Sequence, residues 1–204
     1  MRRVSTARPP RLPRAEREAQ ILDVAHALFA ARGFGAVTMD EVAAEVGVTK
    51  PLLYTYFGNK ERLFLACVAR GGTKLQAAVT EAFTTAPDPG ESLRSGMRAF
   101  LEFLDADRAA WQVLYDPTVP VGGEIELEMD RHREQLAALA AAAVQGVLPG
   151  HSAAEADAMA HALLGAAEGL GRWWLRNTEA LTASEVADLL ITTVEPGIAR
   201  RART

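Results

Sequence analysis

Helix-starting signals recur along this chain, and each is followed by apolar residues spaced three or four positions apart. The signal is a capping box, in which a Ser or Thr and a Glu three residues later bond each other's backbone N–H groups. It occurs at Thr38–Glu41, Ser152–Glu155 and Thr182–Glu185. No segment alternates apolar and polar residues as a half-buried strand would. The pattern therefore predicts an all-α chain.

The breaks between the apolar repeats define the expected helices. The first runs from Arg14 to a stop at Gly33, and a fourth begins after a cap at Asn59. Between them, Thr49 is expected to cap a short helix that has Pro51 in its first turn, where a missing N–H costs least. The predicted ranges are 14–33, 39–46, 49–56, 60–84, 91–105, 107–115, 123–147, 152–177 and 182–202. With 204 residues, of which 49% are hydrophobic, the chain is long enough to bury a core.

The short helices at 39–46 and 49–56 are joined by a Gly-containing turn, which is the layout of a helix-turn-helix. The second helix of such a pair enters the DNA major groove and contacts base edges near its N-terminus. Here it begins in the segment GVTKPLLYTYFGNKE, residues 47–61. Leu53 and Phe57 are expected to point inward. The outward side chains are suited to base edges and phosphate oxygens: Thr49, Lys50, Pro51, Leu52, Tyr54, Thr55 and Tyr56, with Lys60 as a second phosphate contact.

Charge is distributed unevenly between the two parts of the chain. The net charge is −4, but residues 1–62 hold ten Lys and Arg against seven Asp and Glu, and the remainder holds twelve against nineteen. Residues 1–13 are rich in Arg and Pro and are expected to form a disordered basic arm or an inert tail. The asymmetry favours a nucleic-acid-binding N-terminal part.

Residues 19–64, AQILDVAHALFAARGFGAVTMDEVAAEVGVTKPLLYTYFGNKERLF, resemble the DNA-binding region of the TetR family of transcriptional regulators. The resemblance implies a three-helix DNA-binding domain over 14–62, and an effector-binding and dimerisation domain over 63–204. It also implies a homodimer, and it places Thr38 as a phosphate-contacting cap. Pro51, Leu52 and Thr55 depart from the residues frequent in the family, so base preference does not carry over.

The last two helices are the expected dimer interface, because small residues allow helices to approach closely and a two-fold operator needs a two-fold protein. Packing within one subunit is the alternative for these faces. The interface residues expected are Gly165, Gly169, Val186, Leu189, Leu190 and Thr193. An effector pocket is expected inside the body, lined by Phe100, Phe103, Leu104, Trp111, Leu114, Tyr115, Met129, His132, Leu136, Leu164, Glu168 and Trp174.

Two of these pocket residues are polar. His132 and Glu168 each lie on an apolar stripe and are expected to point inward. A buried carboxylate is costly unless it is paired. Glu168 is therefore expected to pair with Arg172 or His132, with a cationic ligand as the alternative partner.

The expected function is a homodimeric repressor that a small apolar or aromatic effector releases from a palindromic operator in double-stranded DNA. An activator, or a regulator that responds to a protein partner, is the alternative. An enzyme is not expected, because the four His and single Cys lack metal-ligand spacing and no Gly-rich phosphate loop follows a strand. We expect no cofactor and no metal. With no signal peptide and no apolar run long enough to cross a bilayer, the protein is expected to be soluble and cytoplasmic.

Overall fold

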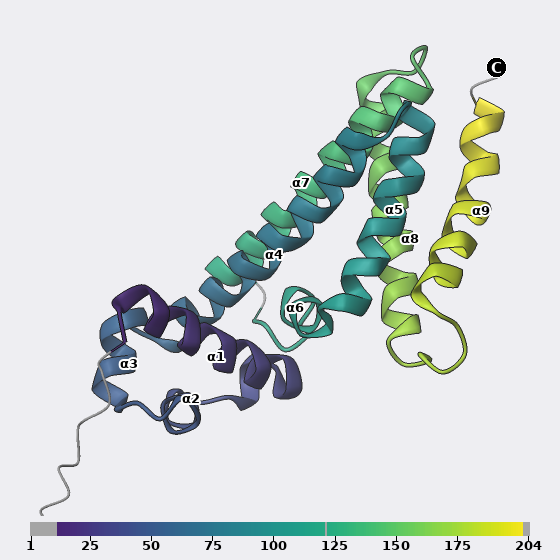
Figure 1. The fold of residues 1–204 in the computed structure, drawn as a ribbon. Coiled ribbons are helices and arrows are strands. Elements are labelled where there is room, and N and C mark those ends of the chain that lie inside the picture. Colours follow the sequence, from purple (N-terminus) through teal and green to yellow (C-terminus); the bar gives the residue numbers. More distant parts are fainter. Residues whose placement is uncertain (1–11, 121, 202–204) are drawn as a thin grey trace, which may run out of the picture.

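The computed structural model describes residues 12–120 and 122–201. Within those ranges the chain forms nine α-helices and no strand, as the sequence predicts. The helices divide in space into a small group, α1 to α3, and a larger group, α5 to α9, with α4 running from one to the other (Figure 1). The predicted basic arm over residues 1–13 lies almost wholly outside the described residues.

The small group consists of α1 (Arg14–Ala36), α2 (Met39–Val46) and α3 (Lys50–Phe57). Gly33 interrupts the helical backbone of α1 with φ 75° and ψ 163°, a conformation that favours Gly. The predicted stop is thus a kink, and a last helical segment continues to Ala36. Gly47 and Gly58, also at positive φ, end α2 and α3.

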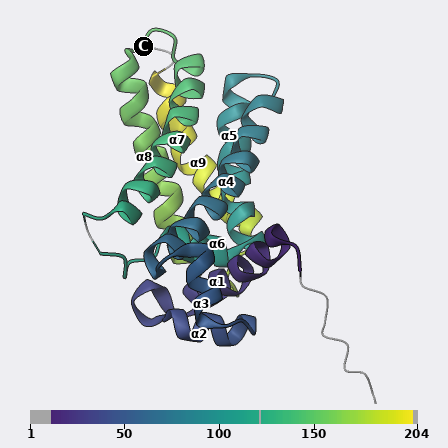
Figure 2. The same cartoon turned by 90° about the vertical axis from the view of Figure 1, so that its left-hand side faces the viewer.

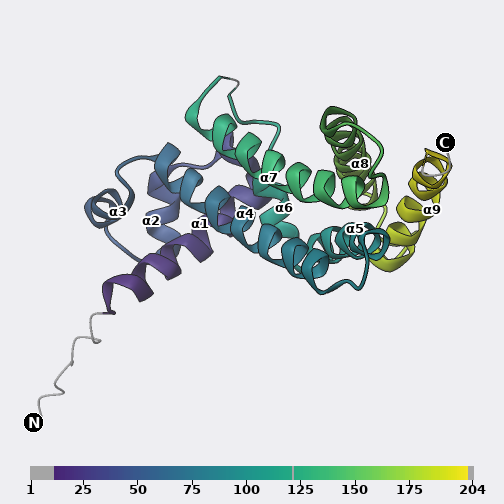
Figure 3. The same cartoon turned by 90° about the horizontal axis from the view of Figure 1, so that it is seen from above.

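The larger group stands above the small one when the molecule is turned (Figure 2). Helix α4 (Lys60–Thr85) is followed by α5 (Pro89–Ala106) and the short α6 (Arg108–Leu114). Helices α7 (Glu124–Val147), α8 (Ala153–Trp174) and α9 (Ala183–Arg201) complete the group. Seen from above, α9 lies at the end of the molecule farthest from α2 and α3 (Figure 3). None of the helices in the described ranges is long and apolar enough to span a membrane.

The two groups share one continuous core of buried side chains. Three aromatic rings connect α1 to α4: the ring of Phe64 meets Phe29 edge-on at 4.9 Å and Phe34 at 5.0 Å between centroids. Phe64 and Leu63, at the start of α4, are fully buried. The first turns of α4 therefore belong to the core that holds α1 in place.

The predicted caps are confirmed at most helix starts. The capping boxes of Thr38 and Ser152 are complete, and Thr182 and Glu185 make the same pair of contacts at the start of α9. Asn59 accepts a hydrogen bond from the Arg62 N–H. Thr49 is at the N-cap of α3, but the prediction that its side chain caps the helix is wrong: it makes no capping hydrogen bond. Its hydroxyl group is thus left on the exposed surface.

Candidate functional site

Helix α3 presents a polar face to solvent and an apolar face to the core. Leu53 and Phe57 are buried, as predicted. The predicted contact residues lie on the other side, where Thr49, Lys50, Pro51, Tyr54 and Thr55 are exposed and Leu52 and Tyr56 are half-buried. The structure thus brings the outward residues of α3 together on one surface beside the N-terminus of the helix.

Lys50 is held near the N-terminus of α3 by the preceding helix. Its Nζ lies 2.7 Å from a carboxylate oxygen of Asp40 in α2 and 5.9 Å from the centre of the Tyr54 ring. The hydrogen bond and charge of Asp40 raise the pKa of Lys50. Both partners are more than half exposed, and an exposed ion pair of this kind is weak. The pair therefore orients the ammonium group without preventing its exchange onto a phosphate.

Thr38 and Lys60, the other two predicted DNA contacts, are engaged within the protein. The Thr38 hydroxyl donates to Glu41 at 2.8 Å as part of the capping box. Lys60 donates from Nζ to the carbonyl oxygen of Phe34 at 2.9 Å and lies over the ring of the same residue at 4.3 Å. Lys60 therefore ties the start of α4 to the end of α1, a role that the sequence did not predict.

Stability should depend on pH through the capping box of α2. Hydrogen bonds from Thr38 and Arg32 lower the pKa of Glu41 from 4.5 to about 2. Because the folded-state pKa is lowered, this stabilisation is present above about pH 4.5 and is lost as the pH falls toward 2. In thermal melts between pH 6 and pH 2, we expect Glu41→Gln to lower the melting temperature at pH 6 and to reduce its drop on acidification. Glu45→Gln, an exposed site on the same helix, is the control, and an unchanged pH profile in Glu41→Gln would contradict the assignment.

The kink of α1 is clamped from the body by the loop after α6. Asp116, 7% exposed, accepts a hydrogen bond from the Phe34 N–H on Oδ2 at 2.5 Å. Its other oxygen accepts from the Thr118 N–H at 2.8 Å and the Thr118 hydroxyl at 2.7 Å. The Thr118 hydroxyl in turn accepts from the Gly35 N–H at 3.3 Å. The peptide of Phe34 is thereby held by Asp116 at its nitrogen and by Lys60 at its carbonyl.

An apolar cavity opens inside the body between α4, α5, α7 and α8. The space between its walls, with the open solvent at its mouth included, is about 420 Å³. Of the predicted pocket residues, Phe100, Leu136 and Leu164 line it. Its other walls were not predicted from the sequence; they are Val79, Phe83, Leu93, Gly96, Met97, Ala140, Leu163 and Ala167. Among the residues that the structure describes, no charged side chain lines the cavity.

The remaining predicted pocket residues lie outside this cavity, either in the core or in hollows nearer α1. Leu104, Leu114 and Trp174 are buried in the core, and Phe103 packs against it. Trp111 and Tyr115, stacked at 3.7 Å between ring centroids, lie toward the small helix group. Both rings line a cleft against α1, and Tyr115 and Met129 line a second hollow next to it. The expectation of a single pocket containing all twelve residues is therefore wrong, because these helices bury part of the set against one another.

The two polar pocket candidates have different surroundings. Glu168 is 8% exposed. It pairs with Arg133, whose Nε donates to Oε1 at 3.2 Å, and with Arg172 at 3.9 Å. The predicted pair with Arg172 is present, whereas the pair with Arg133 was missed. His132 instead packs against Gly72 of α4. Its Nε2 lies 3.4 Å from Glu128, but neither ring nitrogen has a hydrogen-bond partner within residues 12–120 and 122–201.

Tyr115 lies beside Glu168 and Arg133. Burial and the neighbouring Glu168 carboxylate raise the pKa of Tyr115, so the phenol stays protonated and keeps its donor. Arg133 lies over the Tyr115 ring at 5.0 Å. The end of the body that faces α1 therefore contains a polar cluster of Tyr115, Arg133, Glu168 and Arg172.

The predicted dimer residues are divided between the two faces of α8 and α9. Gly165 and Gly169 are exposed on α8, and Leu189 and Thr193 are exposed on α9. The prediction that Val186 and Leu190 lie in the interface is wrong, because both are buried within the chain.

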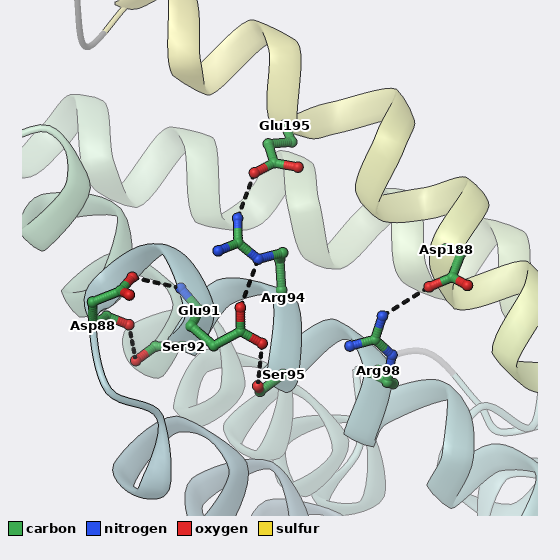
Figure 4. Close-up of polar contacts among 8 residues, drawn as sticks. All are labelled: Asp88, Glu91, Ser92, Arg94, Ser95, Arg98, Asp188 and Glu195. Atoms are coloured by element: carbon green, nitrogen blue, oxygen red, sulfur yellow. Dashed lines mark hydrogen bonds and ion pairs between the residues drawn. The ribbon is translucent and has the colours of Figure 1, made fainter.

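The reason for this burial is the way α9 packs on α5 (Figure 4). Arg98 of α5 pairs with Asp188 of α9 at 2.7 Å, and Arg94 pairs with Glu195 at 2.5 Å. In this packing, the stripe that contains Val186 and Leu190 faces the body, and the two ion pairs flank it. The stripe that contains Leu189 and Thr193 is left on the outer surface.

A helix pair with an exposed recognition face, joined to a helical body with an apolar cavity, defines a helix-turn-helix transcription regulator. Residues 21–67 match the family described as bacterial regulatory proteins, tetR family. Residues 89–195 match the tetracyclin repressor-like C-terminal domain. The chain belongs to the tetR family.

Relatives agree with this assignment. Over 106 residues, the chain is 38% identical to the HTH-type transcriptional activator FasR of Mycolicibacterium smegmatis, and the match covers 52% of this chain and 48% of FasR. The chain thus spans about half the length of that relative. A TetR-like regulator from Rhodococcus sp. RHA1 is 33% identical, with a TM-score of 0.78 over 93% of this chain and 99% of that one. AibR, solved with isovaleryl coenzyme A and operator DNA, has a TM-score of 0.69 at 22% identity, covering 86% and 97% of the two chains, which is a likeness of fold.

Proposed function

We propose that this protein is a homodimeric repressor that a small, largely apolar effector releases from a palindromic DNA operator. The proposal assigns DNA reading to residues 14–62 and effector binding and dimerisation to residues 63–204. The observation that carries it is the exposed face of α3, with Lys50 and Tyr54 beside the helix N-terminus. Backbone N–H groups at that end and the ammonium of Lys50 are suited to phosphate oxygens and guanine edges.

Two copies of the chain are needed to read a palindrome. Recognition helices of a helix-turn-helix dimer lie in successive major grooves about 34 Å apart. The small exposed residues Gly165 and Gly169 on α8, and Leu189 and Thr193 on α9, support a two-fold contact through these helices. A Cβ added at either glycine would meet no described residue of the single chain within 4 Å, which leaves room for a partner helix.

The effector would occupy the cavity between α4, α5, α7 and α8. Its walls are aliphatic and aromatic, so burial of apolar surface would supply most of the binding free energy. The structure of AibR with isovaleryl coenzyme A supports an acyl-type effector for this fold. We therefore favour a ligand with a hydrocarbon portion.

The clamp on Phe34 supports a route from the body to the DNA-reading helices. Asp116 comes from the loop after α6, and Lys60 comes from the first residue of α4. Movement of α4 or α6 around an effector would therefore shift the end of α1 and the attached α2 and α3. The shift in DNA affinity is limited by the difference in effector affinity between the two conformations.

An activator is the second candidate, and the description of FasR as an activator favours it. A regulator that responds to a protein partner is a third. Release from DNA on effector addition separates the repressor from both, because an activator keeps or gains DNA affinity. The operator for this experiment is sought in the DNA upstream of the gene.

Removing the ammonium of Lys50 should weaken operator binding. We expect Lys50→Ala to raise the dissociation constant about tenfold, and to lower the slope of log affinity against log salt by about one if the contact is a phosphate. Tyr54→Phe should weaken binding by a smaller factor, since it removes one hydroxyl donor. Fluorescence anisotropy at two salt concentrations measures both effects.

Lys74→Ala is the matched control, because Lys74 is an exposed lysine of α4 that pairs with Asp107. It removes the same charge outside the proposed interface and should leave the affinity within twofold. Equal weakening by Lys50→Ala and Lys74→Ala would mean that only overall charge matters. Absence of any binding, with random DNA selection also failing, would reject the DNA-binding proposal.

A further inference from the structure

Two arginines of α1 and α4 carry a charge that no carboxylate of the chain neutralises. Arg14, the first residue of α1, and Arg62, in the first turn of α4, are exposed and form no ion pair within residues 12–120 and 122–201. Arg17 has no acidic partner there either, but its guanidinium donates to Gln20 at 2.6 Å. Other cations of α1 to α4 are paired with acids: Arg32 with Glu41, Lys50 with Asp40, Arg70 with Asp23 and Lys74 with Asp107.

Both unpaired guanidinium groups lie at the C-terminal end of α3. Cζ of Arg14 is 5.4 Å from the centre of the Tyr56 ring. The side chain of Arg62 folds back over Gly58, the C-cap of α3, where an added Cβ would lie 3.6 Å from one of its guanidinium nitrogens. Helices α1 and α4 thus each place one arginine beside the last turn of α3.

Tyr56 adds a neutral donor between these two arginines. Its hydroxyl has no hydrogen-bond partner among the described residues. Lys60, the phosphate contact expected at this end of α3, instead donates to the carbonyl oxygen of Phe34. Guanidinium and hydroxyl groups are common ligands of backbone phosphates. The partial negative charge at a helix C-terminus favours cations, but it does not use the exposed N–H donors of the two arginines.

The length of α3 suits contacts at both of its ends. Its eight residues span about 12 Å, and the major groove is about 12 Å wide. A helix of this length seated in the groove keeps both ends within reach of backbone phosphates. Lys50 lies at the first end, and Arg14 and Arg62 lie at the second.

We infer that Arg14, Tyr56 and Arg62 form a second phosphate-binding point of the DNA-reading surface, at the opposite end of α3 from Lys50. The inference rests on the proposed function, since it names further residues that hold the DNA. Phosphate contacts fix the orientation of a protein on the duplex and carry no base information. The three side chains therefore raise the affinity for any duplex by the same factor.

Salt-dependent binding to two fluorescent duplexes tests this inference. One duplex is the DNA upstream of the gene, and the other has the same length and a shuffled sequence. We expect Arg14→Gln and Arg62→Gln each to weaken binding to both duplexes about three- to tenfold, and to lower the slope of log affinity against log salt by about one. Tyr56→Phe should weaken both about twofold without changing the slope, because it removes a hydrogen bond and no charge.

Arg70→Gln is the matched control, because Arg70 is an arginine of α4 whose charge is paired with Asp23 at 2.7 Å. It should leave the slope unchanged and the affinity within twofold. Melting curves establish that each variant folds. The shuffled duplex alone is sufficient to measure the slope, because phosphate contacts do not depend on sequence.

Three outcomes would count against the inference. Unchanged slopes in Arg14→Gln and Arg62→Gln, with DNA binding by the wild type, would overturn it and leave the DNA-reading proposal in place. Weakening confined to the upstream duplex would also overturn it, because the arginines would then shape base recognition by α3. Failure of the wild type to bind either duplex would reject the proposed function and the inference together.

Discussion

Replacing Phe64 by Ala should lower the free energy of unfolding by about 3–5 kcal/mol, the usual cost of removing a buried Phe ring. The Phe64 side chain is fully buried and contacts the rings of Phe29 and Phe34. Loss of the ring would leave a cavity between α1 and α4. It would also loosen Phe34, whose backbone Asp116 and Lys60 hold. Urea denaturation followed by circular dichroism measures the change.

Leu127→Ala serves as the control for this experiment, because Leu127 is 66% exposed. An exposed substitution of this kind changes stability by less than about 0.5 kcal/mol. A loss below about 1.5 kcal/mol in Phe64→Ala would mean that the aromatic cluster does not carry the contact between α1 and α4.

Replacing Asp116 by Asn should weaken the attachment of α1 to the body. The two carboxylate oxygens of Asp116 accept from separate donors, the Phe34 N–H and the N–H and hydroxyl of Thr118. Asn has one acceptor oxygen, so its NH₂ group would face a donor on one side. Losing a hydrogen bond to a charged group costs about 1.5–3 kcal/mol, and we expect this decrease in stability.

Hydrogen exchange provides a local readout of the same substitution. The Phe34 amide should exchange faster in Asp116→Asn by roughly the factor that corresponds to the lost free energy, tenfold for each 1.4 kcal/mol. Asp130→Asn removes the same charge at an exposed site and should leave this amide unchanged. Release from DNA by any effector should also be weakened in Asp116→Asn. Unchanged protection of Phe34 would contradict the clamp.

Features that depend on neighbouring residues could be predicted from the sequence. The capping boxes at Thr38 and Ser152 lie within four residues and form as predicted. The outward face of α3 follows from helical spacing once Leu53 and Phe57 are assigned to the core. In both cases the geometry of one helix determines which groups meet.

Contacts between distant helices could not be predicted in the same way. Asp116 and Phe34 are 82 residues apart, and Glu168 and Arg133 are 35 residues apart. No local pattern distinguishes these residues from other charged residues. Val186 and Leu190 show the same limit, because an apolar stripe indicates burial without indicating whether its partner is the same chain or another one.

The sequence by itself determined the helices, most of their caps and the surface presented by α3, because hydrogen bonds and side-chain spacing within a helix are local. Only the tertiary structure decided where the cavity lies, which partners Glu168 has and how Phe34 is clamped between Asp116 and Lys60. Those features arise where helices cross, and the crossing depends on how the side chains of all the helices pack together.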